Sequence, residues 1–373
     1  MAEKESSATP AVVQTAAETS DHSLERKPKR TRKILWSVGA PIAAILIAFL
    51  VSGIILLLAG FDPVDAFGTL LEGSFGNLRV ITEVLLQATP LIIIGAGLTV
   101  AFRANIWNIG AEGQFYAGGV LAAVVGIYLG SLPAIILVPL VLVVGIIGGA
   151  LWGMLAGWFK VRFGASEIVT TIMLNYIAII TTGYLVTGPL IEEAGKFPQT
   201  AQISEAARLY RFLPPTRLHI GIIIAILVAV AIWVFLFKTS SGYAVRVVGH
   251  NPETARYAGI NVNRNILLAM GISGGAAGLA GAIQVMGLTF RLYQQFSPGY
   301  GFTAIAVALL ANNNPLGVIF SGILFGALRS GSEVMQISAG IPSVMVFTIQ
   351  GLVILSVVTF GVYRMKYANR SGG

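Results

Sequence analysis

Hydrophobic positions in this chain gather into long runs that are separated by short polar breaks. A helix needs about 20 apolar residues to cross the hydrocarbon core of a membrane. The pattern therefore predicts an all-α polytopic membrane protein with about ten transmembrane helices, some of them discontinuous or re-entrant. The predicted spans are 34–59, 84–102, 115–129, 133–159, 167–190, 218–237, 265–288, 302–311, 316–328 and 343–363. Because 302–311 is too short to cross alone, we expect half of a broken helix there, and nine crossings are the alternative.

The most informative polar break lies between residues 103 and 116. Apolar runs flank it on both sides, yet it carries three amides and a carboxylate: Asn105, Asn108, Glu112 and Gln114. A charged side chain near the bilayer centre costs roughly 2.5–3.5 kcal/mol, so such groups normally face a bundle interior or a wet cavity. The nearby glycines at 110 and 113 favour a broken helix that lines a pathway. A short cytoplasmic loop between two helices is the alternative.

The spacing of the polar residues suggests which of them face this pathway. Asn105, Asn108 and Glu112 follow one another by three and four residues, which would place them on one helical face, whereas Gln114 points elsewhere and would brace the break. Aromatic contact with a solute would come from Trp107, Phe115 or Tyr116. A later helix begins at Ser166, and its Asn175 is expected to face the path while its threonines join helices. The predicted substrate path consists of Asn105, Trp107, Asn108, Glu112, Gln114 and Asn175.

A second informative segment, 238–264, leaves the membrane. Asn251 is a predicted N-cap, Pro252 suits the first helical position and Glu253 complements the helix dipole. Gly259 can supply a left-handed stop, so we expect two turns of helix over 252–258. A helix this short is marginal in water, so either the membrane domain or a cytoplasmic partner should hold it.

Composition supports the membrane class and weighs against several chemistries. The 373 residues are 55% hydrophobic and 11% charged, with a mean hydropathy of +0.82, whereas soluble domains carry about 25% charged residues. Cysteine is absent and the three histidines are scattered, so we expect no disulfide, metal or redox cofactor. The sequence has no phosphate-binding loop of the Gly-x-x-x-x-Gly-Lys-Ser/Thr type, so we expect no ATPase site of this type in the chain.

Two function classes that would work without a separate ATPase can be weighed against the residues: an ion-coupled secondary transporter and a membrane enzyme. An ion-coupled secondary transporter should couple through buried acids, and Glu112 is the only strong candidate in the core. A membrane enzyme would need a convergent nucleophile, acid pair or metal cluster, which the sequence does not display.

The net charge of +8 is distributed as in a membrane protein rather than a nucleic-acid-binding one. Most Lys and Arg residues fall on one side of the membrane if both termini are cytoplasmic, as the positive-inside rule requires. Residues 1–33 are expected to be a disordered cytoplasmic tail, whose basic run sets topology or contacts anionic lipid. Residues 365–373 form a second cytoplasmic tail. The extracytoplasmic loop is 191–217, in which 204–212 is expected to be a short surface helix or a solvated lid.

Two motifs carry a resemblance to a known family. Asn105-Ile-Trp-Asn-Ile-Gly-Ala-Glu-Gly-Gln114 and Gly249-His-Asn-Pro-Glu-Thr-Ala-Arg-Tyr-Ala-Gly-Ile260, with 167–176 between them, resemble permease subunits of ATP-binding cassette (ABC) importers for nucleosides and simple sugars. This family is related to the branched-chain amino-acid permeases, and the resemblance covers about 34–364. The polar N-terminus and the Asn-rich 311–315 depart from the family pattern.

The resemblance implies a transport subunit without catalytic residues, in a prokaryotic cytoplasmic membrane. Its coupling helix would contact a separate ATPase through Asn251, Pro252, Glu253, Arg256 and Gly259. Further implied partners are a second permease subunit, in a heterodimer or a homodimer, and an extracytoplasmic substrate-binding protein. The implied solute is a nucleoside, and a simple sugar such as ribose or galactose is the alternative.

Overall fold

The computed structural model describes residues 46–193, 195, 197–342, 344–352, 355, 356 and 359. Within them the structure consists of helices and two isolated β-bridges, so the predicted all-α membrane class is confirmed. Six helices are long and apolar enough to cross a membrane. They are α3 (Leu78–Arg103), α5 (Ala134–Phe163), α6 (Glu167–Thr187), α7 (Gly221–Lys238), α10 continued by η2 (Val262–Thr289) and α12 (Pro315–Ser338).

Shorter helices complete the described part of the chain. Two of them are apolar, Leu46–Leu58 and α11 (Tyr300–Leu310), and α11 is the half-helix expected at 302–311. The others are α2 (Pro63–Phe75), α4 (Ala111–Tyr128), η1 (Glu205–Ala207), α8 (Ser240–His250), α9 (Pro252–Tyr257) and a helical segment at 344–352. Both predicted tails, with the basic run at 26–33 and the basic residues at 364, 366 and 370, lie outside the described residues.

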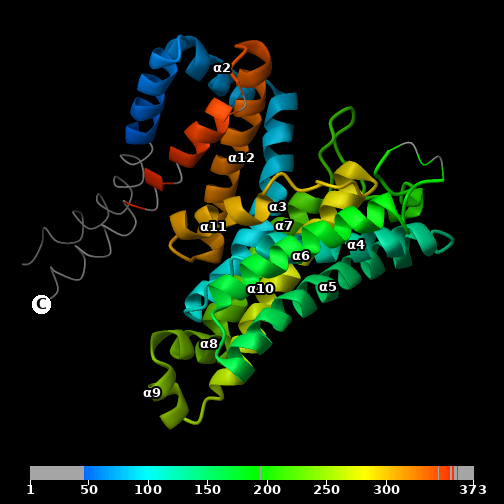
Figure 1. The fold of residues 1–373 in the computed structure, drawn as a ribbon, viewed down its shortest axis with the longest axis vertical. Helices are drawn as coiled ribbons and strands as arrows, with labels where there is room; N and C mark the ends of the chain where they lie inside the picture. Colours follow the sequence, from blue (N-terminus) through cyan, green and yellow to red (C-terminus); the bar gives the residue numbers. More distant parts are fainter. Residues whose placement is uncertain are drawn as a thin grey trace, which may run out of the picture.

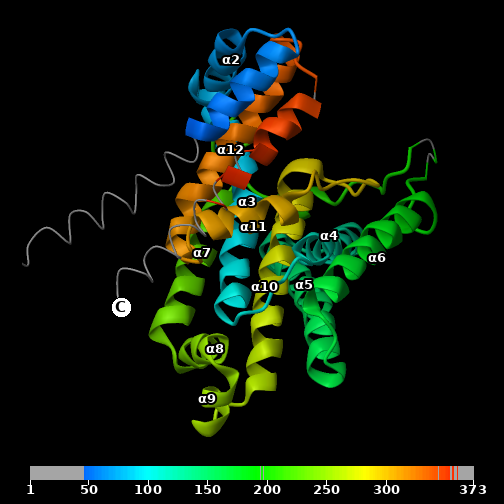
Figure 2. The same cartoon turned by 60° about the vertical axis from the view of Figure 1, so that its left-hand side comes forward.

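Helix α3 runs through the middle of the molecule (Figures 1 and 2). Nearly all of its residues from Thr82 to Ala101 are buried, because α10, α12, α7 and α11 all pack against it. Beside it, α5 and α10 cross at glycines. A Cβ on Gly274 would meet the carbonyl oxygen of Gly149, and a Cβ on Gly278 would meet that of Gly145. Small residues therefore let these two backbones approach closely, as membrane helices commonly do.

One end of the molecule is formed by α8 and α9, at the bottom of Figure 1, and is called here the α9 end. Asn251 caps α9 by accepting hydrogen bonds from the backbone N–H of Glu253 (2.8 Å) and Thr254 (3.1 Å). Gly259 has a φ of +74° and follows the helix. The predicted two-turn helix is thus confirmed, whereas α8 was not predicted because its 11 residues carry only a short apolar face, with Val245 and Val248 buried.

The connection from α6 to α7 lies away from the α9 end, on the right in Figures 1 and 2. The expected surface helix over 204–212 is wrong, since only the single turn Glu205–Ala207 forms. The reason is that this connection pairs with 286–292 instead. The backbone N–H of Ile203 donates to the carbonyl of Phe290 (2.8 Å), and that of Leu209 donates to Met286 (3.0 Å). Ile203, Ala207 and Leu209 are consequently buried, which excludes a solvated lid there.

Candidate functional site

Helix α3 ends at the predicted polar break in an ordered turn. Asn105 adopts a φ of +57°, and the N–H of the next residue, Ile106, donates to the carbonyl of Ala101 (2.9 Å). The N–H of Asn105 itself donates to Phe102 (3.0 Å). This pair of bonds around a left-handed residue is a Schellman motif, with asparagine in the position that glycine usually takes. The chain then runs through 104–110 without helix and enters α4 at Ala111.

A buried pair of amides holds the break to α4 and α10. Asn108 Nδ2 donates to Gln114 Oε1 (2.9 Å) and to Ser273 Oγ (2.9 Å). Gln114 Nε2 donates back to Asn108 Oδ1 (3.0 Å), which also accepts from the backbone N–H of Gly110 (3.0 Å). All these groups are buried. The amides thereby satisfy one another instead of presenting free donors and acceptors to a solute.

Asn175 on the neighbouring helix α6 supplies hydrogen-bond partners to the backbone at the start of α4. Its Oδ1 accepts from the N–H of Gly113 (2.7 Å), and its Nδ2 donates to the carbonyl of Ile109 (2.9 Å). The first N–H groups of any helix lack partners within that helix, and Gly110 at the N-cap of α4 has no side chain to supply one. Asn175 does so from a neighbouring helix. A Cβ on Gly113 would lie 2.9 Å from the Cα of Asn175, so this approach requires glycine.

Glu112 connects the break with the half-helix α11. Its Oε2 accepts from the backbone N–H of Gly301 (2.7 Å) in the first turn of α11, and the carboxylate is only 2% exposed. A negative charge at that position is stabilised by the positive end of the α11 dipole.

The asparagine run at 312–314 forms a second break at the other end of α11. Asn312 and Asn313 both have a positive φ, of 52° and 54°, and Asn314 caps α12 by accepting from the N–H of Leu316 (3.1 Å). Asparagine tolerates the left-handed conformation and caps helices, which explains why the run departs from the family pattern. Arg103, at the end of α3, donates from Nε to the carbonyl of Asn313 (2.8 Å), so the two breaks are in contact.

The structure brings together four of the six predicted path residues. Asn108, Glu112, Gln114 and Asn175 are buried and bonded within the chain. Asn105 and Trp107 instead lie on the outside of the break, where Trp107 is 45% exposed. The expectation of one helical face for Asn105, Asn108 and Glu112 is wrong because residues 104–110 are not helical, whereas the bracing role expected of Gln114 matches its bonds. Sequence reasoning missed Ser273, which lies in a glycine-rich stretch of α10.

The predicted coupling residues lie together at the α9 end. One face of α9 is packed, since Ala255 is buried against Val248 and Val262. The rest of α9 is uncovered in the described chain: Asn251, Pro252, Glu253, Arg256 and Gly259 are exposed, and Tyr257 is 93% exposed. A two-turn helix with one anchored face and several exposed polar side chains is suited to meet another protein.

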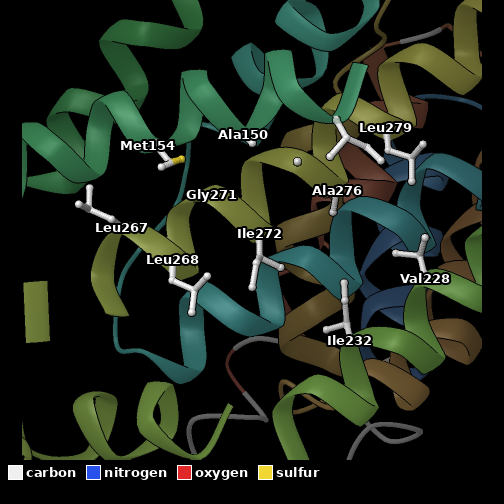
Figure 3. A pocket seen from close by; sticks show the side chains of 12 residues that line it. Ala150, Met154, Val228, Ile232, Leu267, Leu268, Gly271, Ile272, Ala276 and Leu279 are labelled. Atoms are coloured by element: carbon white, nitrogen blue, oxygen red, sulfur yellow. The ribbon is translucent and has the colours of Figure 1, made fainter. Parts of the chain in front are cut away.

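Two cavities differ in what they can bind. The larger, of about 420 Å³, lies between α5, α7 and α10 and is lined only by aliphatic side chains, methionine and glycine (Figure 3). Since it offers no polar side chain, it cannot recognise a hydroxylated solute. The smaller, of about 340 Å³, lies where the last two turns of α6 face Gln294 and Gln295.

Comparison with known proteins gives the class of the chain. Residues 80–358 match the family of the branched-chain amino acid transport system / permease component. The chain is 38% identical to a guanosine ABC transporter permease of Bacillus subtilis over 85% of this chain and 92% of that protein. It is 34% identical to a glucose ABC transporter permease of Haloferax volcanii over 92% and 94% of the two chains, and 32% identical to a nucleoside ABC transporter permease of Lactococcus lactis over 87% and 90%. No solved structure matches.

The chain therefore belongs to the branched-chain amino acid transport system / permease component family. It is a multi-pass permease subunit of an ABC importer.

Proposed function

We propose that this chain forms the translocation path of an ABC importer for nucleosides and is driven by a separate cytoplasmic ATPase. The nucleoside and guanosine permeases among its relatives support this solute class. The glucose permease of H. volcanii, similar over almost the whole chain, favours a sugar as the second candidate.

A path of contacts that starts at α9 supports the proposed coupling to the ATPase. Ala255 of α9 packs on Val248 of α8, and next to it Gly249 lies so close to the carbonyl of Arg103 that no side chain would fit. Arg103 ends α3 and bonds to Asn313 in the second break. A push on α9 therefore reaches both breaks through packed backbone, without a flexible loop in between. We infer that Glu253 and Arg256, both exposed on α9, meet the ATPase.

The polar break has a bracing role in this proposal. The start of α4 is held by Asn108, Gln114 and Asn175, and the start of α11 is held by Glu112. Helices α4 and α11 can therefore each move as one unit when α9 is pushed. Asn105 and Trp107, on the outside of the break, are the two predicted path residues left free to touch a solute.

A second permease subunit would complete the path. Helix α6 exposes large side chains on one face over most of its length: Val169, Met173, Tyr176, Ile180 and Tyr184. Their spacing of three to four residues forms a continuous stripe. We propose that this stripe faces the path and the second subunit, which is a related permease or a second copy of this chain. The substrate-binding protein would dock at the end opposite α9.

Ten crossings with both termini in the cytoplasm fit this arrangement. The α9 end is then cytoplasmic, and the connection 188–220 is extracytoplasmic. The tails that decide this topology lie outside the described residues.

Uptake by whole cells tests the solute class. Cells that express the chain with its ATPase and binding protein should accumulate radiolabelled guanosine, and cells that lack only this chain should not. Accumulation of labelled glucose or ribose, with no guanosine uptake above that of the deletion strain, would replace the nucleoside assignment by the sugar one.

A further inference from the structure

The smaller cavity lies beside the last turns of α6. This end of α6 is far from α9 and leads into the connection 188–220 (Figure 1). Its volume of about 340 Å³ falls in the range of small-molecule sites, roughly 300–1,000 Å³. Its lining combines aliphatic contacts with a phenol ring, a hydroxyl and two amides: Ile179, Ile180, Gly183, Tyr184, Thr187, Gln294 and Gln295. No lining residue is charged, so the cavity suits a neutral polar solute.

The amides of this cavity stand on a fixed support. The segment that carries them pairs with the α6–α7 connection: the N–H of Thr200 donates to the carbonyl of Leu292 (2.9 Å), and the N–H of Leu292 donates to Thr200 Oγ1 (3.1 Å). Arg291 forms an ion pair with Glu192 (3.2 Å) on that connection. Gln294 and Gln295 follow two and three residues after Leu292, so several bonds hold the segment that carries them to the α6–α7 connection.

The two amides and the phenol of the cavity remain available to a ligand, whereas the Thr187 hydroxyl donates to the carbonyl of Gly183 (2.9 Å). Gln294 and Gln295 are exposed, and neither side-chain amide is hydrogen-bonded to another residue of the described chain. An amide offers a donor and an acceptor side by side, the arrangement that recognises the edge of a purine base. Tyr184 is 68% exposed, and its ring can stack on a heteroaromatic base.

The same segment leads from the cavity to the polar break. Phe296, the next residue after Gln295, is buried and stacks on Phe115 with ring centroids 5.1 Å apart; it also packs edge-on against Tyr116 at 4.7 Å. Both rings belong to α4, about one turn beyond Glu112, which binds the start of α11. A solute bound to Gln295 would therefore contact the residue next to Phe296, which packs on α4. Helix α4 also carries Glu112, which joins it to α11.

We propose that this cavity is an outer solute subsite of the translocation path, where Tyr184 stacks on the base of a nucleoside and Gln294 and Gln295 bind its edge or its hydroxyls. The proposal rests on the proposed function, because it presumes nucleoside import. It adds a binding site to the path, away from the polar break that the sequence motif marks.

Photolabelling tests occupancy directly. An azido-substituted purine nucleoside, irradiated with the purified complex of permeases and ATPase, should label a peptide that contains residues 179–187 or 293–296. Unlabelled guanosine should suppress the labelling. Labelling confined to peptides from the polar break, or labelling that guanosine does not suppress, would overturn the proposal.

Transport by variants supplies a second readout that does not depend on the label. Base stacking is worth about 5- to 150-fold per ring, so Tyr184→Ala should lower guanosine transported per ATP hydrolysed at least about fivefold, while Tyr184→Phe keeps the ring and stays near wild type. Binding-protein-stimulated ATPase activity should be unchanged in both, which separates a lost solute contact from misfolding. Phe320→Ala removes an exposed ring from α12, outside both the cavity and the α6 stripe, and is the matched control.

The outcomes separate the two proposals. If the wild-type complex imports guanosine but Tyr184→Ala and Gln294→Ala transport it as well as wild type, the subsite is wrong and nucleoside import stands. If the wild-type complex imports no nucleoside, the proposed function is wrong and the subsite is wrong with it.

Discussion

Replacing Asn175 by alanine separates a bracing role from a solute-binding role. The side chain makes two hydrogen bonds to the start of α4, one to the buried N–H of Gly113 and one to the half-buried carbonyl of Ile109. Leaving a buried donor without a partner costs about 1–3 kcal/mol and losing the second bond about 0.5–1.5 kcal/mol, so we expect a loss of about 1.5–4.5 kcal/mol. The thermal unfolding temperature of the detergent-solubilised protein should fall by several degrees.

Thr170→Ala is the matched control for this experiment. Thr170 lies on the same helix, but it is only half-buried, and its hydroxyl bonds only to the carbonyl of Ser166 one turn earlier (2.8 Å). Its replacement should leave the unfolding temperature unchanged. If Asn175→Ala is as stable as Thr170→Ala and instead weakens solute binding by the complex, then Asn175 contacts the solute and the bracing argument is refuted.

Three further predictions concern coupling, the half-helix and topology. Reversing both charges, Glu253→Lys with Arg256→Glu, should abolish ATP-driven uptake without reducing membrane insertion. Arg162→Glu, exposed near the end of α5 and outside α9, should have no effect, and full transport by the double variant would exclude α9 from coupling. Glu112→Gln keeps an acceptor for the N–H of Gly301 and should retain transport, whereas Glu112→Ala should lose it; equal loss in both would mean that the charge itself is needed. Arg370→Cys, in a chain that otherwise lacks cysteine, should react with an impermeant thiol reagent only in inverted vesicles, and labelling of intact cells would disprove the even number of crossings.

Local features of the fold could be predicted because local residues determine them. The N-cap, proline and glycine around α9 specify its start and its end, and the structure has both where the sequence indicates them. Helix α3 ends at Arg103, where the predicted polar break begins. In the same way, the apolar runs predict the membrane class, since hydropathy reports directly on transfer into lipid.

The site was less predictable because its partners are distant in sequence. Glu112 binds a backbone group 189 residues away, and Asn108 binds Ser273, 165 residues away. No periodicity encodes such pairs. The helical-face argument for the polar break failed for a related reason: it assumed a helix where Asn105 takes a left-handed conformation, which asparagine permits but does not require. Segment 204–212 likewise does not form the expected helix, because the connection hydrogen-bonds to 286–292 instead.

The most direct test of the account is the energy source for guanosine uptake by the purified complex. Proteoliposomes that contain this chain with its partner permease and ATPase, supplied with the loaded binding protein, should take up labelled guanosine when ATP is present on the ATPase side. Uptake should stop with a non-hydrolysable ATP analogue and persist when ionophores collapse every ion gradient. Uptake driven by an ion gradient without ATP would contradict the account and identify a secondary transporter.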